Sequence, residues 1–249
     1  MIQLMIFSFW IESKMIFGAP KITKEFHKLG LPVAQKTVSK YMKELGIKAC
    51  YIRPYVRTTT DPDFDESLKN LLQEQFNPEQ PNALWCSDIT YIHTEEGFVY
   101  LTSIMDLFSR KIIAWRLSDT LEAKWVVECI LEAKGSRRIA KPLVLHSDRG
   151  SQYVSGVYMD ALGTLMPSYS QKASPWQNAC IESFHALIKR EWLYRHNIKD
   201  YMHAKKLVFE YIDTFYNTLR GHSHCDYLSP QQFEDLYYEG LNQSIPIAS

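Results

Sequence analysis

The chain has 249 residues with 28 basic and 28 acidic side chains, and 46% of its residues are hydrophobic while 22% are charged. This composition is typical of a folded globular protein and excludes a disordered chain. No apolar run approaches the roughly 18 residues of a membrane span, and the opening MIQLMIFSFW lacks a basic start and a cleavage pattern, so we predict neither a membrane segment nor a signal peptide.

The first 60 residues are basic and predict a small helical module. They hold ten Lys and Arg residues against three Glu residues, a net charge of +7, so the remainder carries −7. Apolar spacing predicts one helix before the break at residues 30–32 and a second one closed by Gly46. MIQLMIFSFW is interpreted as part of a buried helix whose upstream half is missing. Lys36, Lys40 and Lys43 share the solvent side of the second helix, which suits a helix-turn-helix along DNA phosphates, although a plain helical hairpin explains the pattern equally well.

Residues 51–80 are predicted to be a linker around one short helix, because they contain a threonine run and prolines that include Pro62 and Pro78. From Leu84 onward β-branched and aromatic residues prevail. The stretches LWCSDITYIH, GFVYLTSIMDL and KIIAWRL predict three antiparallel strands, with a turn at 95–97 between the first two.

Helices and strands alternate in the rest of the chain. We expect helices at 119–135, 155–165, 178–194 and 200–219, the last with a buried stripe that ends at Leu219. Between them, LVLHSD is continuously apolar and suits a central parallel strand, and a short strand follows at 167–170. The order βββαβαβα predicts the α/β class, with a mixed sheet flanked by helices.

The five cysteines are scattered and form no CxxC pair, so they predict free thiols rather than a disulfide framework. The stretch from His222 to Cys225 has metal-ligating residue types, but nothing supplies the second half of a zinc site. A polar loop between helices is therefore the preferred interpretation.

Three carboxylates form a candidate metal site. Asp88 lies inside an apolar strand, where an unpaired charge is costly. Asp148 ends the strand LVLHSD just before a glycine turn, and adjacency of these two strands would bring both aspartates together. Glu182 lies two helical turns before Lys189, on the same helix face. Converging carboxylates can hold two Mg²⁺ ions, yet each residue alone also has an ordinary explanation as a cap, an ion-pair partner or a surface charge.

Five motifs in order carry a family resemblance: WCSDITYI, DLFSRKIIAW, HSDRGSQY, NACIESFHALIKRE and YNTLRGHSHCDYLSP. They resemble the integrase-core motifs of bacterial insertion-sequence transposases, in particular the second-reading-frame (OrfB-type) protein of a two-frame element. FGAPKI and VSKYMKELGI resemble the helix-turn-helix-like segment that precedes the core in that family. The match spans about residues 5–240.

The resemblance implies a ribonuclease-H-like fold shared with retroviral integrases, with a mixed five-stranded sheet flanked by helices behind a small all-α module. We expect four segments: a helix-turn-helix-like DNA-binding module at 1–50, truncated at its start, a linker at 51–80, the catalytic core at 81–198, and a C-terminal helical extension at 199–249. Asp106 and the pair Ser109-Arg110 match a family motif, but a structural hairpin role is preferred for them.

The resemblance also implies a catalytic triad of Asp88, Asp148 and Glu182 that binds two Mg²⁺ ions, with Mn²⁺ as a substitute. The residues expected to contact DNA are Lys189, Lys36, Lys40, Lys43, Trp176 and Asn178. The implied reaction is strand cleavage by water, followed by attack of the freed 3′-hydroxyl on target DNA. The implied partners are the terminal repeats, target DNA, the first-frame DNA-binding protein and further copies of the chain, in the bacterial cytoplasm at the nucleoid.

The chain departs from the family pattern at one point that bears on the triad. Between Asp148 and Glu182 lie 33 residues, slightly fewer than is usual, and the shortfall falls near residues 163–169. Two alternatives stay open: a ribonuclease-H-like nuclease with the same triad, and a truncated, non-catalytic DNA-binding remnant.

Overall fold

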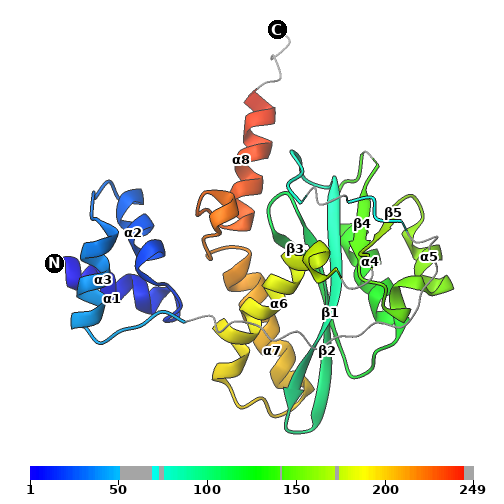
Figure 1. The fold of residues 1–249 in the computed structure, drawn as a ribbon, viewed down its shortest axis with the longest axis horizontal. Helices are drawn as coiled ribbons and strands as arrows, with labels where there is room; N and C mark the ends of the chain where they lie inside the picture. The colour runs from blue at the N-terminus through cyan, green and yellow to red at the C-terminus, as the bar shows by residue number, and fades with distance from the viewer. Residues whose placement is uncertain (51–68, 73–75, 141, 172–173, 244–249) are drawn as a thin grey trace.

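A computed structural model describes residues 1–50, 69–72, 76–140, 142–171 and 174–243. Its sheet has five strands, in the order β3-β2-β1-β4-β5 (Figure 1). They are β1 Leu84–Thr94, β2 Gly97–Asp106, β3 Lys111–Ser118, β4 Val144–Ser147 and β5 Met166–Tyr169. The first three are antiparallel neighbours, whereas β4 runs parallel to β1 and β5 parallel to β4. This mixed sheet confirms the predicted architecture.

Strand β1 is much longer than its neighbour β4. It pairs with β2 from Trp85 to Thr94, which lies opposite Gly97, where the glycine takes a φ of +128° that an L side chain rarely adopts. With β4 it pairs only through residues 84–86. From Asp88 onward, therefore, one edge of β1 has left its parallel partner.

Helices cover both faces of the sheet (Figure 1). The helices beyond the N-terminal module are α4 Ala123–Ser136, α5 Gly156–Leu162, α6 Ala179–Glu191, α7 Tyr201–Tyr211 and α8 Pro230–Gln243. Strand alternation divides the core, because successive side chains point to opposite faces. Trp85 packs with the α4 and α5 side, whereas Cys86 packs with the α6 and α7 side.

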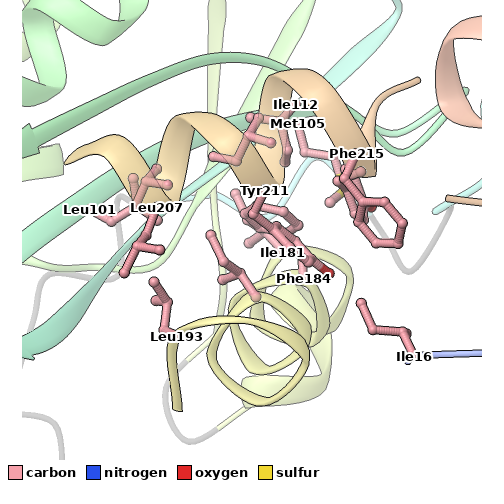
Figure 2. Packing of buried hydrophobic residues seen from close by; sticks show 14 of the residues in the cluster. Ile16, Leu101, Met105, Ile112, Ile181, Phe184, Leu193, Leu207, Tyr211 and Phe215 are labelled. Carbon is pink, nitrogen blue, oxygen red and sulfur yellow. The ribbon is translucent and has the colours of Figure 1, made fainter. Parts of the chain in front are cut away.

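Aromatic side chains fill the layer between α6, α7 and the sheet. Figure 2 shows Tyr211 and Phe215 beside Ile181 and Phe184 of α6. The Phe184 ring meets that of Tyr216 edge to face, with 4.8 Å between ring centroids. Such pairs add to the stabilisation that comes from area burial alone. This packing fixes how α6 lies against the sheet.

The helix predicted at 200–219 is interrupted. After α7 the chain forms a π-helical turn, Ile212–Tyr216, and Asn217 donates its amide to the carbonyl of Ile212. The wider turn lets both Ile212 and Tyr216 face the core. Leu219, expected on the buried stripe, follows this irregularity and is 66% exposed.

The residues after this turn hydrogen-bond to β3 and to the end of α6. Asn217 accepts from the Ile112 amide at 3.0 Å and donates to its carbonyl at 2.9 Å, which satisfies an edge position of β3. Arg220 donates two hydrogen bonds of 2.7 Å to Glu191 at the end of α6. Bidentate, buried pairs of this kind fix geometry strongly. The motif YNTLR therefore has a structural explanation in the packing of α6 and β3.

The C-terminal extension is anchored through one buried carboxylate on α8, which projects beyond the sheet (Figure 1). Glu234 accepts hydrogen bonds from Arg137 at 2.9 and 3.0 Å and from the Ser109 hydroxyl at 2.7 Å. Asp106 is fully buried and accepts from the amides of Asn82 and Phe108. These contacts support the structural role preferred for Asp106 and Ser109.

The 222–225 stretch and the cysteines have structural places in this fold. All five cysteines are free thiols, as predicted. Cys225 donates to the carbonyl of Ser109, and His224 lies 2.9 Å from the carbonyl of Phe108, so the 222–225 stretch packs against the β2–β3 turn. Over the residues described, no helix is long and apolar enough to cross a membrane.

The N-terminal module contains three helices: α1 Ile2–Glu12, α2 Ala19–Lys28 and α3 Gln35–Glu44. This confirms the predicted helical module, although most of the predicted linker lies outside the described residues. The expected burial of the first helix is wrong for its outer side: Ile6 is buried, but Leu4 is 75% exposed. The reason is that α1 packs against α2 and α3 along one side only, as in the edge-to-face contact of Phe9 with Phe26.

Lys21 of α2 lies where the module meets the core. Its ammonium group is buried without a hydrogen-bond partner, 5.0 Å from the centroid of the Phe17 ring. Burial lowers the pKa of Lys21 from its ordinary 10.5 to about 7, and the neighbouring Arg220 lowers it further while Glu191 opposes the shift. When the Lys21 amine is charged, its burial therefore destabilises the contact between the N-terminal module and the core.

We therefore predict that Lys21→Met raises the free energy of unfolding at pH 7 by about 1 to 3 kcal/mol, because it removes an unsatisfied buried polar group. The stability of the parent chain should rise between pH 7 and 10, since the unfolded chain keeps a proton that the folded chain has released. Urea unfolding at several pH values measures both. If the difference in the free energy of unfolding between Lys21→Met and the parent chain did not narrow as the pH rises, the charge-based explanation would be contradicted.

Candidate active site

Two aspartates meet at the edge of the sheet where β1 and β4 part. Cys86 of β1 pairs with His146 of β4 in the parallel register. Asp88 lies two residues after Cys86, and Asp148 lies two residues after His146. Asp88 and Asp148 line one pocket of about 230 Å³, together with Tyr91, Tyr153 and Gln152. The predicted adjacency of the two strands is confirmed.

The loop after Asp148 is shaped around its carboxylate. The amide of Gly150 donates to Asp148 Oδ1 at 2.9 Å. A Cβ atom at Gly150 would lie 3.1 Å from the same oxygen, tighter than nearly all such contacts, so the glycine supplies space rather than unusual backbone angles. Before the loop, His146 bridges the hydroxyls of Ser168 and Ser170, and burial lowers its pKa to about 4. His146 is therefore neutral, and its hydrogen bonds join β4 to β5 and to the residue that follows it.

Glu182 approaches from the first turn of α6, where its side chain stays accessible to solvent. Partial desolvation raises the pKa of Glu182 from 4.5 to about 7, and repulsion from Asp88 and Asp148 adds to the shift. Glu182 lies one turn before His185 on α6, and the His185 ring is 3.2 Å from Asp88, so the helix brings the third carboxylate toward the other two despite the 33 intervening residues.

The donor set fits a hard divalent cation. Three carboxylates provide the oxygen ligands that Mg²⁺ prefers, and a cation would relieve their mutual repulsion. As they lie in the described ranges, no three His, Cys, Asp or Glu side chains are close enough together to hold a metal ion, so the three carboxylates would have to move closer to bind one. Asp88 and Asp148 open onto the pocket described above.

Sequence reasoning missed His185. Its ring is buried between Asp88 Oδ2 and the Ser103 hydroxyl, at 3.2 Å from each. Ser103 lies directly opposite Asp88 on β2, so the histidine ties α6 to both strands. A detectable signal existed, because His185 follows Glu182 by three positions and so shares its helix face.

Tyr153 was also missed, although it ends the motif HSDRGSQY. Its hydroxyl lies 3.0 Å from that of Ser87, and the ring is buried in the wall of the pocket. Burial raises the pKa of Tyr153 well above its usual value, and the charges of Asp88 and Asp148 add to this effect. The phenol therefore stays protonated beside the carboxylates.

The residues expected to contact DNA fall in different places. Lys189 lies near the carboxylates, with its ammonium 4.3 Å from the centroid of the Tyr91 ring; desolvation lowers its pKa, while Asp88 raises it. Trp176, just before α6, is 53% exposed. Asn178 is buried and donates to the carbonyl of Ser87 at 3.4 Å. That placement favours a role in holding α6 to β1 over the direct DNA contact expected from the sequence.

The three lysines of the N-terminal module are not brought to the pocket. Lys36, Lys40 and Lys43 are exposed on α3, which lies far from β4 in Figure 1. Lys40 is 3.8 Å from Glu44, an exposed pair that contributes little to stability. The solvent face predicted for this helix is confirmed.

Comparisons with known proteins agree with this geometry. The integrase core domain family matches residues 78–206, and an HTH-like domain family matches residues 2–55. The transposase for insertion sequence element IS904 of Lactococcus lactis is 38% identical, over 90% of this chain and 89% of that protein. Transposase InsF for insertion sequence IS3A of Escherichia coli is 34% identical, over 90% and 78%.

Solved structures show the same fold at low sequence identity. A chain of the simian T-cell lymphotropic virus intasome, solved in complex with the PP2A regulatory subunit B56 gamma, matches with a TM-score of 0.52 and 14% identity. The match covers 93% of this chain and 76% of that one. This likeness supports the ribonuclease-H-like arrangement of the sheet and its helices.

We predict that His185→Phe weakens Mn²⁺ binding by about 10- to 100-fold, the usual range for residues that orient a metal ligand. The physical reason is that Asp88 loses its hydrogen-bond partner and can rotate. Calorimetric titration measures the affinity, and His27→Phe, at an exposed histidine of the module, is the control. Unchanged affinity in a folded His185→Phe variant would show that His185 does not orient Asp88.

Glu182 predicts a second, pH-dependent effect. Because its pKa is about 7, Mn²⁺ must displace a proton below that pH, so affinity should rise from pH 6 to 8. Glu182→Gln should bind more weakly and flatten this pH dependence. The same variant should raise the thermal midpoint of the metal-free protein at pH 8, because the carboxylate repulsion is gone. A lower midpoint there would contradict the assigned coupling.

Proposed function

Because this chain belongs to the integrase-core family of insertion-sequence transposases, we propose that it cleaves DNA at insertion-sequence ends and joins the freed 3′-hydroxyl to target DNA. The observation that supports this proposal is that Asp88 and Asp148 share one pocket where β1 and β4 part, with α6, which carries Glu182, in contact with Asp88 through His185. Three acidic side chains beside an open pocket suit phosphoryl transfer, which depends mainly on positioning and electrostatics.

In this proposal Asp88, Asp148 and Glu182 hold two Mg²⁺ ions, or Mn²⁺ in their place. When bound, the ions supply Lewis-acid activation and charge stabilisation at the phosphate. His185 keeps the Asp88 carboxylate in a fixed rotamer, and the Gly150 amide does so for Asp148. Lys189 offers its cation to the DNA backbone at the side of the pocket.

The N-terminal module would add DNA affinity that is separate from the chemistry. Lys36, Lys40 and Lys43 form an exposed basic face on α3, suited to phosphates along a groove. Trp176 is exposed just ahead of α6 and would contact DNA near the carboxylates. The ligands in this proposal are the terminal repeats and the target duplex.

The proposed setting follows from that substrate. Both DNA ends of an element must be held together, so we assign the active form to a homo-oligomer on DNA in the bacterial cytoplasm, at the nucleoid. The first-frame DNA-binding protein of the same element is the further partner proposed. The relatives are called transposases, and this chain spans 89% of the one from Lactococcus lactis.

The triad predicts the outcome of a strand-transfer assay with terminal-repeat DNA. With Mg²⁺ or Mn²⁺, the chain should cleave the ends and join them to a target plasmid. Asp88→Asn, Asp148→Asn and Glu182→Gln should each lower the joining rate by at least about 100-fold. Each variant removes a carboxylate that would hold the metal ions, and these ions stabilise the charge of the transition state. DNA binding, measured by mobility shift, should remain within a few-fold.

Other outcomes would assign the chain differently. Cleavage of RNA–DNA hybrids without joining would favour a ribonuclease-H-like nuclease. Binding to terminal repeats without cleavage would favour a non-catalytic remnant. Full activity in all three variants would contradict the triad itself.

A further inference from the structure

Two aromatic rings stand exposed on the β1–β2 hairpin beyond the aspartates. Tyr91 is 59% exposed and Phe98 is 53% exposed, and their rings meet edge to face at 5.5 Å. Their strand neighbours Ile92 and Val99 are buried in the core, so the two rings occupy the opposite face of the hairpin. Among the described residues, no other element buries these two rings.

A cation joins this surface to the carboxylates. Lys189 of α6 places its ammonium 4.3 Å from the centroid of the Tyr91 ring, while Glu182 lies two turns away on the same helix. Tyr91 also lines the pocket that contains Asp88 and Asp148. The Tyr91 ring, the Lys189 ammonium group and the two aspartates therefore border one surface beside the part of β1 that β4 does not pair.

The dimensions and lining of the pocket restrict its ligand. Its far wall includes Tyr100, the cross-strand partner of Tyr91, and Leu121, whose carbonyl accepts from Gln152 at 3.0 Å. At about 230 Å³ it is smaller than the 300 to 1,000 Å³ usual for drug-sized ligands. A single flat ring attached to a phosphate matches these aromatic walls and the neighbouring ammonium group.

We propose that Tyr91 and Phe98, with Lys189 at their side, bind an unpaired nucleobase of the DNA strand next to the carboxylates. Base faces are covered inside a duplex, so stacking on exposed aromatic side chains requires a base that has left its pair. The nearby cation suits the phosphate of that same nucleotide. This inference rests on the proposed function only in taking DNA as the ligand.

The consequence for the reaction is positional. Holding an unpaired base on Tyr91 would draw its strand along the part of β1 that β4 does not pair and past Asp88. Because stacking tolerates any base, the site would recognise an opened DNA end rather than a sequence. Tyr91 and Phe98 are thus positioning residues for the strand.

The test compares two DNA probes on the full chain without divalent metal, so that no strand is cut. One probe is a duplex with a three-nucleotide 3′ overhang that contains 2-aminopurine, and the other is the blunt duplex of the same sequence. The parent chain should bind the overhang more tightly and quench its fluorescence. Tyr91→Ala and Phe98→Ala should weaken overhang binding by roughly 5- to 100-fold and leave blunt-duplex binding within about twofold.

Three controls separate stacking from other roles. Tyr91→Phe keeps the ring and should keep the overhang affinity. Tyr194→Ala removes an aromatic side chain that is 74% exposed elsewhere and should change neither probe. Thermal midpoints of all variants should match the parent, since the altered rings lie outside the core.

The inference is overturned if the parent chain does not prefer the overhang, or if Tyr91→Ala weakens both probes equally. Loss of self-association in Tyr91→Ala, with unchanged DNA binding, would instead assign this surface to a contact between copies of the chain. Failure of the proposed function is distinct: a chain without strand transfer could still show a Tyr91-dependent overhang preference. Conversely, an active chain with no such preference would refute only the stacking site.

Discussion

The short parallel pairing between β1 and β4 is the constraint on which the site depends. Three residue pairs hold the strands together, and both aspartates follow at the point where the strands separate. Asp88 and Asp148 therefore share one pocket, and β1 continues beyond them without pairing to β4. Partial burial raises the pKa of Glu182, and the negative charges of Asp88 and Asp148 raise it further. The same arrangement that is unfavourable in the bare protein is suited to bind divalent cations.

The position of α6 is set from its other end. Glu191 closes the helix through its bidentate pair with Arg220, and Asn217 of the same segment fixes the backbone of β3. Phe184 and its aromatic neighbours fill the layer below (Figure 2). A C-terminal segment remote from the pocket therefore determines where Glu182, His185 and Lys189 lie. The N-terminal module meets this same cluster at Lys21, whose buried amine disfavours that contact when it is charged.

Much of this arrangement could be predicted because its signals are local. Period-two alternation and the Gly97 turn indicate the β1–β2 hairpin, and the apolar run before Asp148 indicates a central strand. Asp88 stood out because a lone charge inside a strand is costly. Features that depend on tertiary packing were missed: the exposed side of α1, the π-helical turn after Tyr211, and the burial of Asn178. His185 was overlooked because its partner lies 97 positions away. The segment boundaries remain predictions.

The central proposal is that residues from three separate elements hold divalent ions at one place. Fe²⁺ in place of Mg²⁺, with ascorbate and peroxide, generates hydroxyl radicals that cut the backbone next to bound metal. The account predicts metal-dependent cuts near residues 88, 148 and 182 in the same chain, all lost together in Asp148→Asn. Cuts confined to one of these segments, or cuts elsewhere that persist in that variant, would contradict it.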